Sequence, residues 1–160
     1  MSADTHARGG ATVAVLPSLD AWEAGLVVNL RRWCSGPEGQ KQVWGDYART
    51  FGDPLGRREM RAFETLMTTV IEYAHRPLVR HGVNCTCVGS DESVFLHLVR
   101  TASEGHLADA ALIATLLAGP AQAENIALLA GQVGQGARQI APQKTYGHIT
   151  RRDTNVVRLH

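Results

Sequence analysis

The sequence predicts an all-α fold, a compact bundle of five to seven short helices with an extended N-terminal arm and a flexible basic C-terminal tail. Through most of the chain, apolar residues recur every three or four positions, which is the spacing of one helix face. Gly and Pro interrupt this pattern repeatedly, as they do between short helices. The composition is 44% hydrophobic and 19% charged, which is enough apolar mass for a core. Because aromatic residues make up only 6%, we expect Ala, Leu and Val to build most of it.

The length of 160 residues suits one domain. We divide the chain into an arm, a single helical domain and a tail, at 1–17, 18–136 and 137–160. Within the domain we expect the first helices, then a loop rich in His and Cys, then Ala-rich helices, at 18–75, 76–89 and 90–134.

The arm contains one short apolar segment at 11–16, with the β-branched Val13 and Val15. A lone strand has no partner in this chain, so we expect the segment to pack along a helix rather than join a sheet. The N-terminus has the charge order of a signal peptide. Its apolar part is short and runs straight into a helix pattern, so we expect it to remain uncleaved.

Three helices are predicted in the first half of the domain. The first begins at Ser18, a good N-cap residue, and stops at Gly36-Pro37. Its buried face consists of Leu19, Trp22, Leu26, Leu30 and Trp33. The second helix spans about 38–51 and the third about 57–74. The buried face of the third consists of Met60, Phe63, Met67, Val70 and Ala74.

Three Ala-rich helices are predicted after the loop. One is capped by Ser90 and ends at Gly105, and the last spans 121–133. The helix between them, at 106–118, is apolar almost all round apart from Asp109. A helix that is hydrophobic on every side is either central in the core or buried against another subunit.

The loop places His75, His81, Cys85 and Cys87 within thirteen residues. All four side chains are of types that bind Zn(II), and a loop can wrap round an ion. The spacing departs from that of zinc fingers, whose Cys pairs lie two to four residues apart, and a Cys-x-Cys pair can also be redox-active. The favoured interpretation is that the cysteines are small hydrophobes that pack the loop. Zn(II) binding or redox sensing is the alternative.

A basic corner lies at the start of the third helix, with Arg57, Arg58 and Arg61. Together with the preceding helix it resembles a helix-turn-helix unit. In that register, however, Arg58 and Arg61 would occupy positions where the motif needs aliphatic residues. We therefore favour two packed core helices with a solvated Arg corner, and nucleic-acid binding is the less favoured alternative.

The charge balance is 16 basic against 15 acidic residues, which is not the basic footprint of a protein that coats nucleic acid. The charges are unevenly placed. Residues 101–137 contain three acids and no Lys or Arg, whereas 138–160 contain five basic residues, Arg151 and Arg152 among them, against one acid. The tail is therefore a candidate contact for an acidic partner.

Compartment and source follow from composition. Three cysteines are too few, and odd in number, for a disulfide framework, so we expect a reducing cytoplasm. No apolar run is long enough to span a membrane. Fourteen Arg against two Lys, with 21 Ala, is typical of GC-rich coding and indicates a bacterial source.

We expect a non-enzymatic bacterial protein that acts by binding another protein, as an adaptor or regulator. The partner is either a different chain or a second copy of this one. The alternatives are a metal- or redox-sensing domain that uses the His/Cys loop, and a DNA-binding regulator that uses the Arg corner and the tail. No cofactor is expected except Zn(II) in the first of these alternatives.

Overall fold

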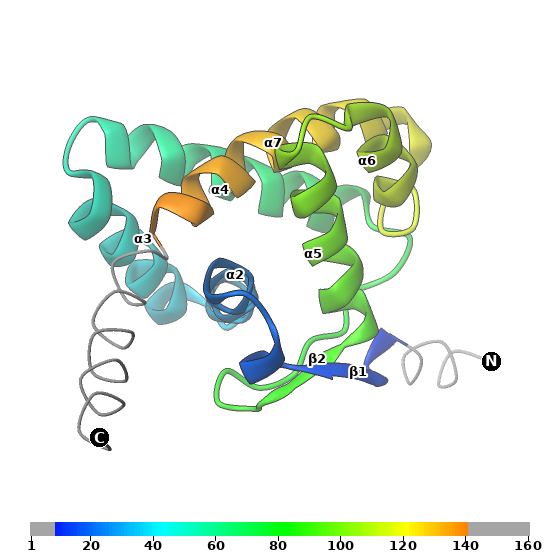
Figure 1. Ribbon diagram of the computed structural model, residues 1–160, viewed down its shortest axis with the longest axis horizontal. Coiled ribbons are helices and arrows are strands. Elements are labelled where there is room, and N and C mark those ends of the chain that lie inside the picture. The colour runs from blue at the N-terminus through cyan, green and yellow to red at the C-terminus, as the bar shows by residue number, and fades with distance from the viewer. Residues whose placement is uncertain (1–8, 141–160) are drawn as a thin grey trace, which may run out of the picture.

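A computed structural model describes residues 9–140 of the chain. In this range it contains six α-helices, two short strands and two 3₁₀ turns (Figure 1). The strands are β1 (Thr12–Val15) and β2 (Cys87–Gly89), and the helices are α2 (Ala21–Trp33), α3 (Pro37–Phe51), α4 (Leu55–Tyr73), α5 (Ser90–Ser103), α6 (Leu107–Ala114) and α7 (Ala123–Ile140). The predicted all-α fold is confirmed.

The start of α2 differs from the prediction. Its N-cap is Asp20, not Ser18, and Asp20 forms a capping box with Glu23. Ser18 lies in the preceding 3₁₀ turn, where its hydroxyl donates to the carbonyl of Val15. The carboxylate of Glu23 accepts the backbone N–H of Asp20. Ser18 cannot form the same reciprocal pair, because no acid lies three positions after it.

The expectation that the apolar arm segment pairs with no strand is wrong. β1 pairs antiparallel with β2, with Thr12 opposite Gly89 and Val15 opposite Cys87. The partner strand lies at the end of the His/Cys loop, where the sequence shows no period that would indicate a strand. This small sheet ties the N-terminal segment to the loop and to the start of α5.

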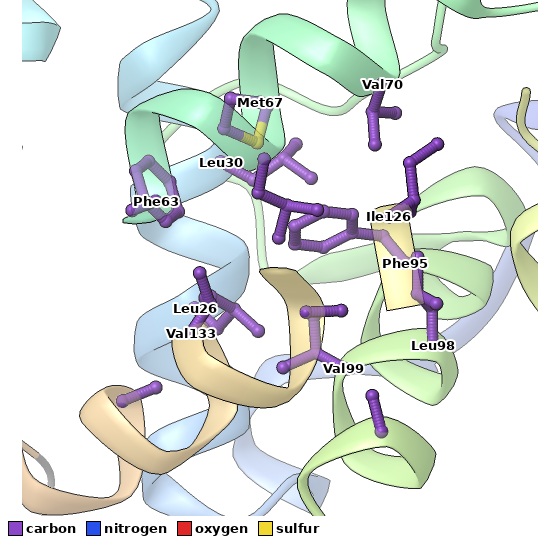
Figure 2. Packing of buried hydrophobic residues seen from close by; sticks show 14 of the residues in the cluster. Leu26, Leu30, Phe63, Met67, Val70, Phe95, Leu98, Val99, Ile126 and Val133 are labelled. Carbon is purple, nitrogen blue, oxygen red and sulfur yellow. The ribbon is translucent and has the colours of Figure 1, made fainter. Parts of the chain in front are cut away.

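The core lies between α2, α4, α5 and α7 (Figure 2). The buried side chains that Figure 2 labels are Leu26, Leu30, Phe63, Met67, Val70, Phe95, Leu98, Val99, Ile126 and Val133. The faces predicted for the first and third helices are the faces that pack here, apart from the half-buried Leu19 and Ala74 at their ends.

α7 is longer than predicted. It continues through Gly134 and Gly136 to Ile140, so residues 137–140 belong to this helix and not to a tail. The glycines permit close packing: a Cβ on Gly134 would lie 2.6 Å from the Cβ of Ser103, and one on Gly131 would lie 3.3 Å from the carbonyl of Ala102. The rest of the predicted tail, with Arg151 and Arg152, lies outside the described residues.

α6 is not central in the core, which excludes one of the two placements expected for it. Only Ala110 and Ala114 of this helix are buried, while Leu107 and Leu112 are exposed. In Figure 1, α5 runs from the sheet at the bottom of the view to α6 at the top. None of the helices within residues 9–140 has the length and apolarity that a membrane span requires.

Candidate functional site

A buried ion pair holds the His/Cys loop to the helices. Arg31 of α2 and Glu92 of α5 are 0% and 1% exposed. Arg31 Nε donates to Glu92 Oε1 at 2.7 Å, and Nη2 donates to Oε2 at 2.9 Å. The remaining guanidinium protons reach loop carbonyls: Nη1 donates to Gly82 and Cys85, and Nη2 to Cys87. A single buried cation therefore fixes both the ion pair and the path of the loop.

The Glu92 carboxylate is fully engaged as well. It accepts the backbone N–H of His81 at 3.1 Å and that of Gly89 at 2.9 Å. Burial by itself raises the pKa of Glu92, but the hydrogen bonds from Arg31, Gly89 and His81 outweigh it and leave the pKa below its ordinary value. The pKa of Arg31 is raised, chiefly by its hydrogen bonds to Glu92. Both groups are therefore charged at neutral pH.

The neighbouring Asp91 also connects the loop to α5. Asp91 accepts two hydrogen bonds from Arg76, at 2.7 and 2.9 Å, and one from the backbone of Val79 at 2.8 Å. The sequence explains Asp91 and Glu92 as helix N-terminal acids, and Glu92 does accept the backbone N–H of Gly89. The N-cap is Gly89, so Ser90 is the first helical residue and not the cap. The contacts of the two acids with the loop were missed because their cationic partners are remote in sequence.

The four predicted metal ligands do not come together. His81 Nδ1 lies 3.8 Å from Cys85 Sγ, but His75 points elsewhere, with its Nε2 2.9 Å from the carbonyl of Thr115. Cys87 is half-buried at the start of β2. Within residues 9–140, no group of three or more His, Cys, Asp and Glu side chains is placed to hold a metal ion. His81 and Cys85 are two donors, one short of such a group.

The basic corner is solvated, as the favoured interpretation expects. Arg57, Arg58 and Arg61 are exposed at the start of α4. Arg57 Nη2 pairs with Asp53 at 2.6 Å, and Arg58 lies 3.9 Å from Glu59. A partner of Arg57 or Arg58 would have to compete with these local acids.

An apolar surface lies at the α6 end of α5, away from the β1–β2 sheet (Figure 1). Four leucines are exposed on α6, on the turn that follows it, and on α7: Leu107, Leu112, Leu116 and Leu128. We call this set the α6–α7 apolar face. Leu112 and Leu128 are 68% and 60% exposed. A groove of about 500 Å³ runs between the two helices, lined by Leu107, Ala108, Ala111, Leu112, Glu124, Ala127 and Leu128. The sequence predicted a helix here that is apolar almost all round, and the structure shows that α7 contributes to the same surface.

The charge around this face is acidic. Glu124 lines the groove, and Asp109 is exposed on α6. No Lys or Arg occurs between residues 101 and 137.

Comparisons with family models, curated proteins and solved structures find no match to this chain.

Proposed function

We propose that the protein acts by binding another protein, and that the α6–α7 apolar face receives an amphipathic helix of that partner. The observation that carries the proposal is the groove between α6 and α7, which the exposed Leu107, Leu112 and Leu128 line. Contiguous exposed apolar surface on a soluble domain commonly marks an interaction site. Each of these leucines would lose its contact with water when a partner helix covers it.

The shape of the surface favours a helix as its occupant. The groove lies between α6 and α7. Among its lining residues, Ala111 and Leu112 lie three and four positions after Ala108 on α6, as Ala127 and Leu128 do after Glu124 on α7. Helix-in-groove recognition uses such spacing, because apolar anchors of the bound helix recur every three or four residues. The small side chains of Ala108, Ala111 and Ala127 leave room for those anchors.

The charge of the surface favours a basic partner. Glu124 lies in the groove wall, and Asp109 is exposed on α6. Residues 101–137 contain no Lys or Arg. Lys or Arg on the rim of the bound helix would pair with these carboxylates. Rim charges of this kind act mainly on the association rate and on the choice of partner.

A second copy of this chain is the competing occupant. Its matching face would carry the same acids, and like charges across an interface are unfavourable.

Metal sensing, DNA binding and the expected lack of enzymatic activity stay predictions.

The proposal is tested with a designed peptide. A fluorescent amphipathic helix with Leu on one face and Lys on its flanks is titrated with the full-length protein, and its anisotropy gives Kd. We expect Leu112→Glu and Leu128→Glu each to weaken binding by at least about tenfold, because truncating a central anchor costs about 2 kcal/mol or more. Glu124→Lys should also weaken it.

Ile71→Glu is the matched control, since Ile71 is also exposed, at 49%, but lies on α4. It should leave Kd unchanged. The proposal is wrong if the peptide does not bind, or if Ile71→Glu weakens binding as much as Leu112→Glu does. Sedimentation of the free protein tests the occupant: a dimer that Leu112→Glu dissociates would replace the partner helix by a second copy.

A further inference from the structure

We propose that Cys85 is a reactive thiol that forms mixed disulfides with small disulfide molecules, and that His81 is the base that activates it. This inference is independent of the α6–α7 apolar face. It rests on the geometry of one imidazole, which lies between the sulfur of Cys85 and a backbone carbonyl from the N-terminal segment.

The hydrogen bonds of His81 fix which ring nitrogen carries the proton. Nε2 lies 2.9 Å from the carbonyl oxygen of Gly10. A carbonyl oxygen only accepts, so Nε2 is the donor and holds the proton. In the neutral ring, Nδ1 then has a free lone pair, and it is Nδ1 that lies 3.8 Å from Cys85 Sγ. The thiol therefore faces the basic nitrogen of the ring.

Further contacts position His81 and its ring. Besides the contact with Gly10, the backbone N–H of His81 donates to Glu92 Oε1 at 3.1 Å. Gly89 lies directly against the ring: a Cβ on this residue would come within 3.1 Å of His81 Cδ2 and Nε2. A nucleophile, a base and a group that orients the base are the parts that covalent catalysis by a side chain requires.

The surroundings of the sulfur also include a buried cation. Arg31 Nη1 donates to the carbonyl of Cys85 at 2.6 Å. Arg31 Nη2 donates likewise to the carbonyl of Cys87. The guanidinium therefore fixes the backbone of Cys85, whose sulfur lies beside His81.

The proposed step is thiol–disulfide exchange. Cys85 gives its proton to His81 Nδ1 while Sγ attacks one sulfur of the small disulfide. A new S–S bond forms to Cys85 and the original S–S bond breaks. The leaving sulfur takes the proton from the imidazolium as it departs. One thiol is consumed and one is released, so no other oxidant is needed.

Cys34 is the contrasting thiol within the same chain. Burial raises the pKa of Cys34, and this is only partly offset by Arg80, which donates to its carbonyl at 3.0 Å. Cys34 and Cys85 are both half-buried, so Cys34 serves as a comparison thiol of similar burial.

The experiment uses the reduced full-length protein with oxidised glutathione as the probe. Peptide mass spectrometry follows mixed-disulfide formation at each of the three cysteines. We expect Cys85 to react at least about tenfold faster than Cys34, a threshold below the roughly 10²–10⁴-fold that a positioned base supplies. This comparison within one molecule requires no variant.

His81→Gln separates the base from its structural role. The Gln amide nitrogen can still donate to the carbonyl of Gly10, but no basic nitrogen faces Cys85. We expect the rate at Cys85 to fall about tenfold or more, with the rates at Cys34 and Cys87 unchanged. His97→Gln, at an exposed histidine of α5, is the control and should change none of the rates.

Two results would overturn the proposal. Cys85 would react no faster than Cys34 in the wild-type protein, or His81→Gln would leave the rate at Cys85 unaltered. If the reaction rates at all three cysteines rise in His81→Gln, the substitution has opened the loop. The comparison of Cys85 with Cys34 in the wild-type protein then decides the proposal.

Discussion

At Arg31 and Glu92, two full charges lie in the interior, where desolvation is costly. Their pairing and the five hydrogen bonds that they make to loop backbone groups offset that cost. The pair connects α2, α5 and the loop, so it acts as a structural clasp. The same clasp places His81 and Cys85, which makes loop chemistry dependent on residues outside the loop.

Glu92→Gln should lower the free energy of unfolding by about 3 kcal/mol, because it leaves the charge of Arg31 buried without a counterion. Urea unfolding measures the change. Glu38→Gln is the control: Glu38 pairs with Lys41 on an exposed surface of α3, and its loss should cost less than about 0.5 kcal/mol. Equal effects of the two substitutions would contradict the proposed role of the clasp.

The lowered pKa of Glu92 also predicts how stability depends on pH. The folded protein binds this proton more weakly than the unfolded chain does, so folding is favoured where the carboxyl is ionised. That contribution is fully present above the ordinary glutamate pKa of about 4.3, and it is lost as pH falls through the folded value. Urea unfolding between about pH 6 and pH 3 should therefore show a falling free energy, and a flatter fall in Glu92→Gln.

Tyr47 supplies a contrasting residue. It is 1% exposed, and none of the described residues accepts or donates a hydrogen bond at its hydroxyl. Burial raises the pKa of this phenol. Tyr47→Phe should leave stability unchanged or raise it by up to about 1 kcal/mol, because a buried unpaired hydroxyl is removed. A thermal melt with a clearly lowered Tm would show that the hydroxyl has a partner.

At the scale of elements, α7 is the central helix: it packs against α4, α5 and α6. The periodic apolar residues predicted most of the helices, because a buried stripe leaves a repeat in the sequence. The glycines of α7 are the reason that its predicted C-terminal end was too early. Gly normally indicates the end of a helix, but here it lets α7 approach α5 closely. Only the packing of α5 against α7 requires Gly at these positions, and the local sequence does not show that packing.

Gly134→Ala and Gly25→Ala test this explanation as a pair. At Gly134 an added methyl meets Ser103 Cβ at 2.6 Å and Val99 Cγ1 at 3.0 Å, so we expect a loss of about 1–3 kcal/mol. At Gly25, on an exposed part of α2, nothing lies within 4 Å, and helix propensity predicts a gain of about 0.5–1 kcal/mol. Denaturant unfolding measures both, and a stabilised Gly134→Ala protein would contradict the packing role.

At the scale of the whole molecule, the end of the loop that leads into β2 and the groove between α6 and α7 lie at opposite ends of α5 (Figure 1). Sequence reasoning found part of each. It selected His81 and Cys85 by residue type and α6 by its apolarity. It could not pair β1 with β2, nor Arg31 with Glu92, because such contacts join distant segments and leave no local period. It also could not show that Leu128 of α7 lies beside α6.

We propose that the α6–α7 apolar face binds a basic amphipathic helix in the cell. Site-specific photo-cross-linking tests it most directly, with a photoreactive residue in place of Leu112 or, as the control, Ile71. We predict a discrete adduct from position 112 and none from position 71, with the cross-linked partner peptide an amphipathic helix rich in Lys or Arg. Equal labelling from both positions, no adduct at all, or an adduct whose peptide comes from this same chain would contradict the claim.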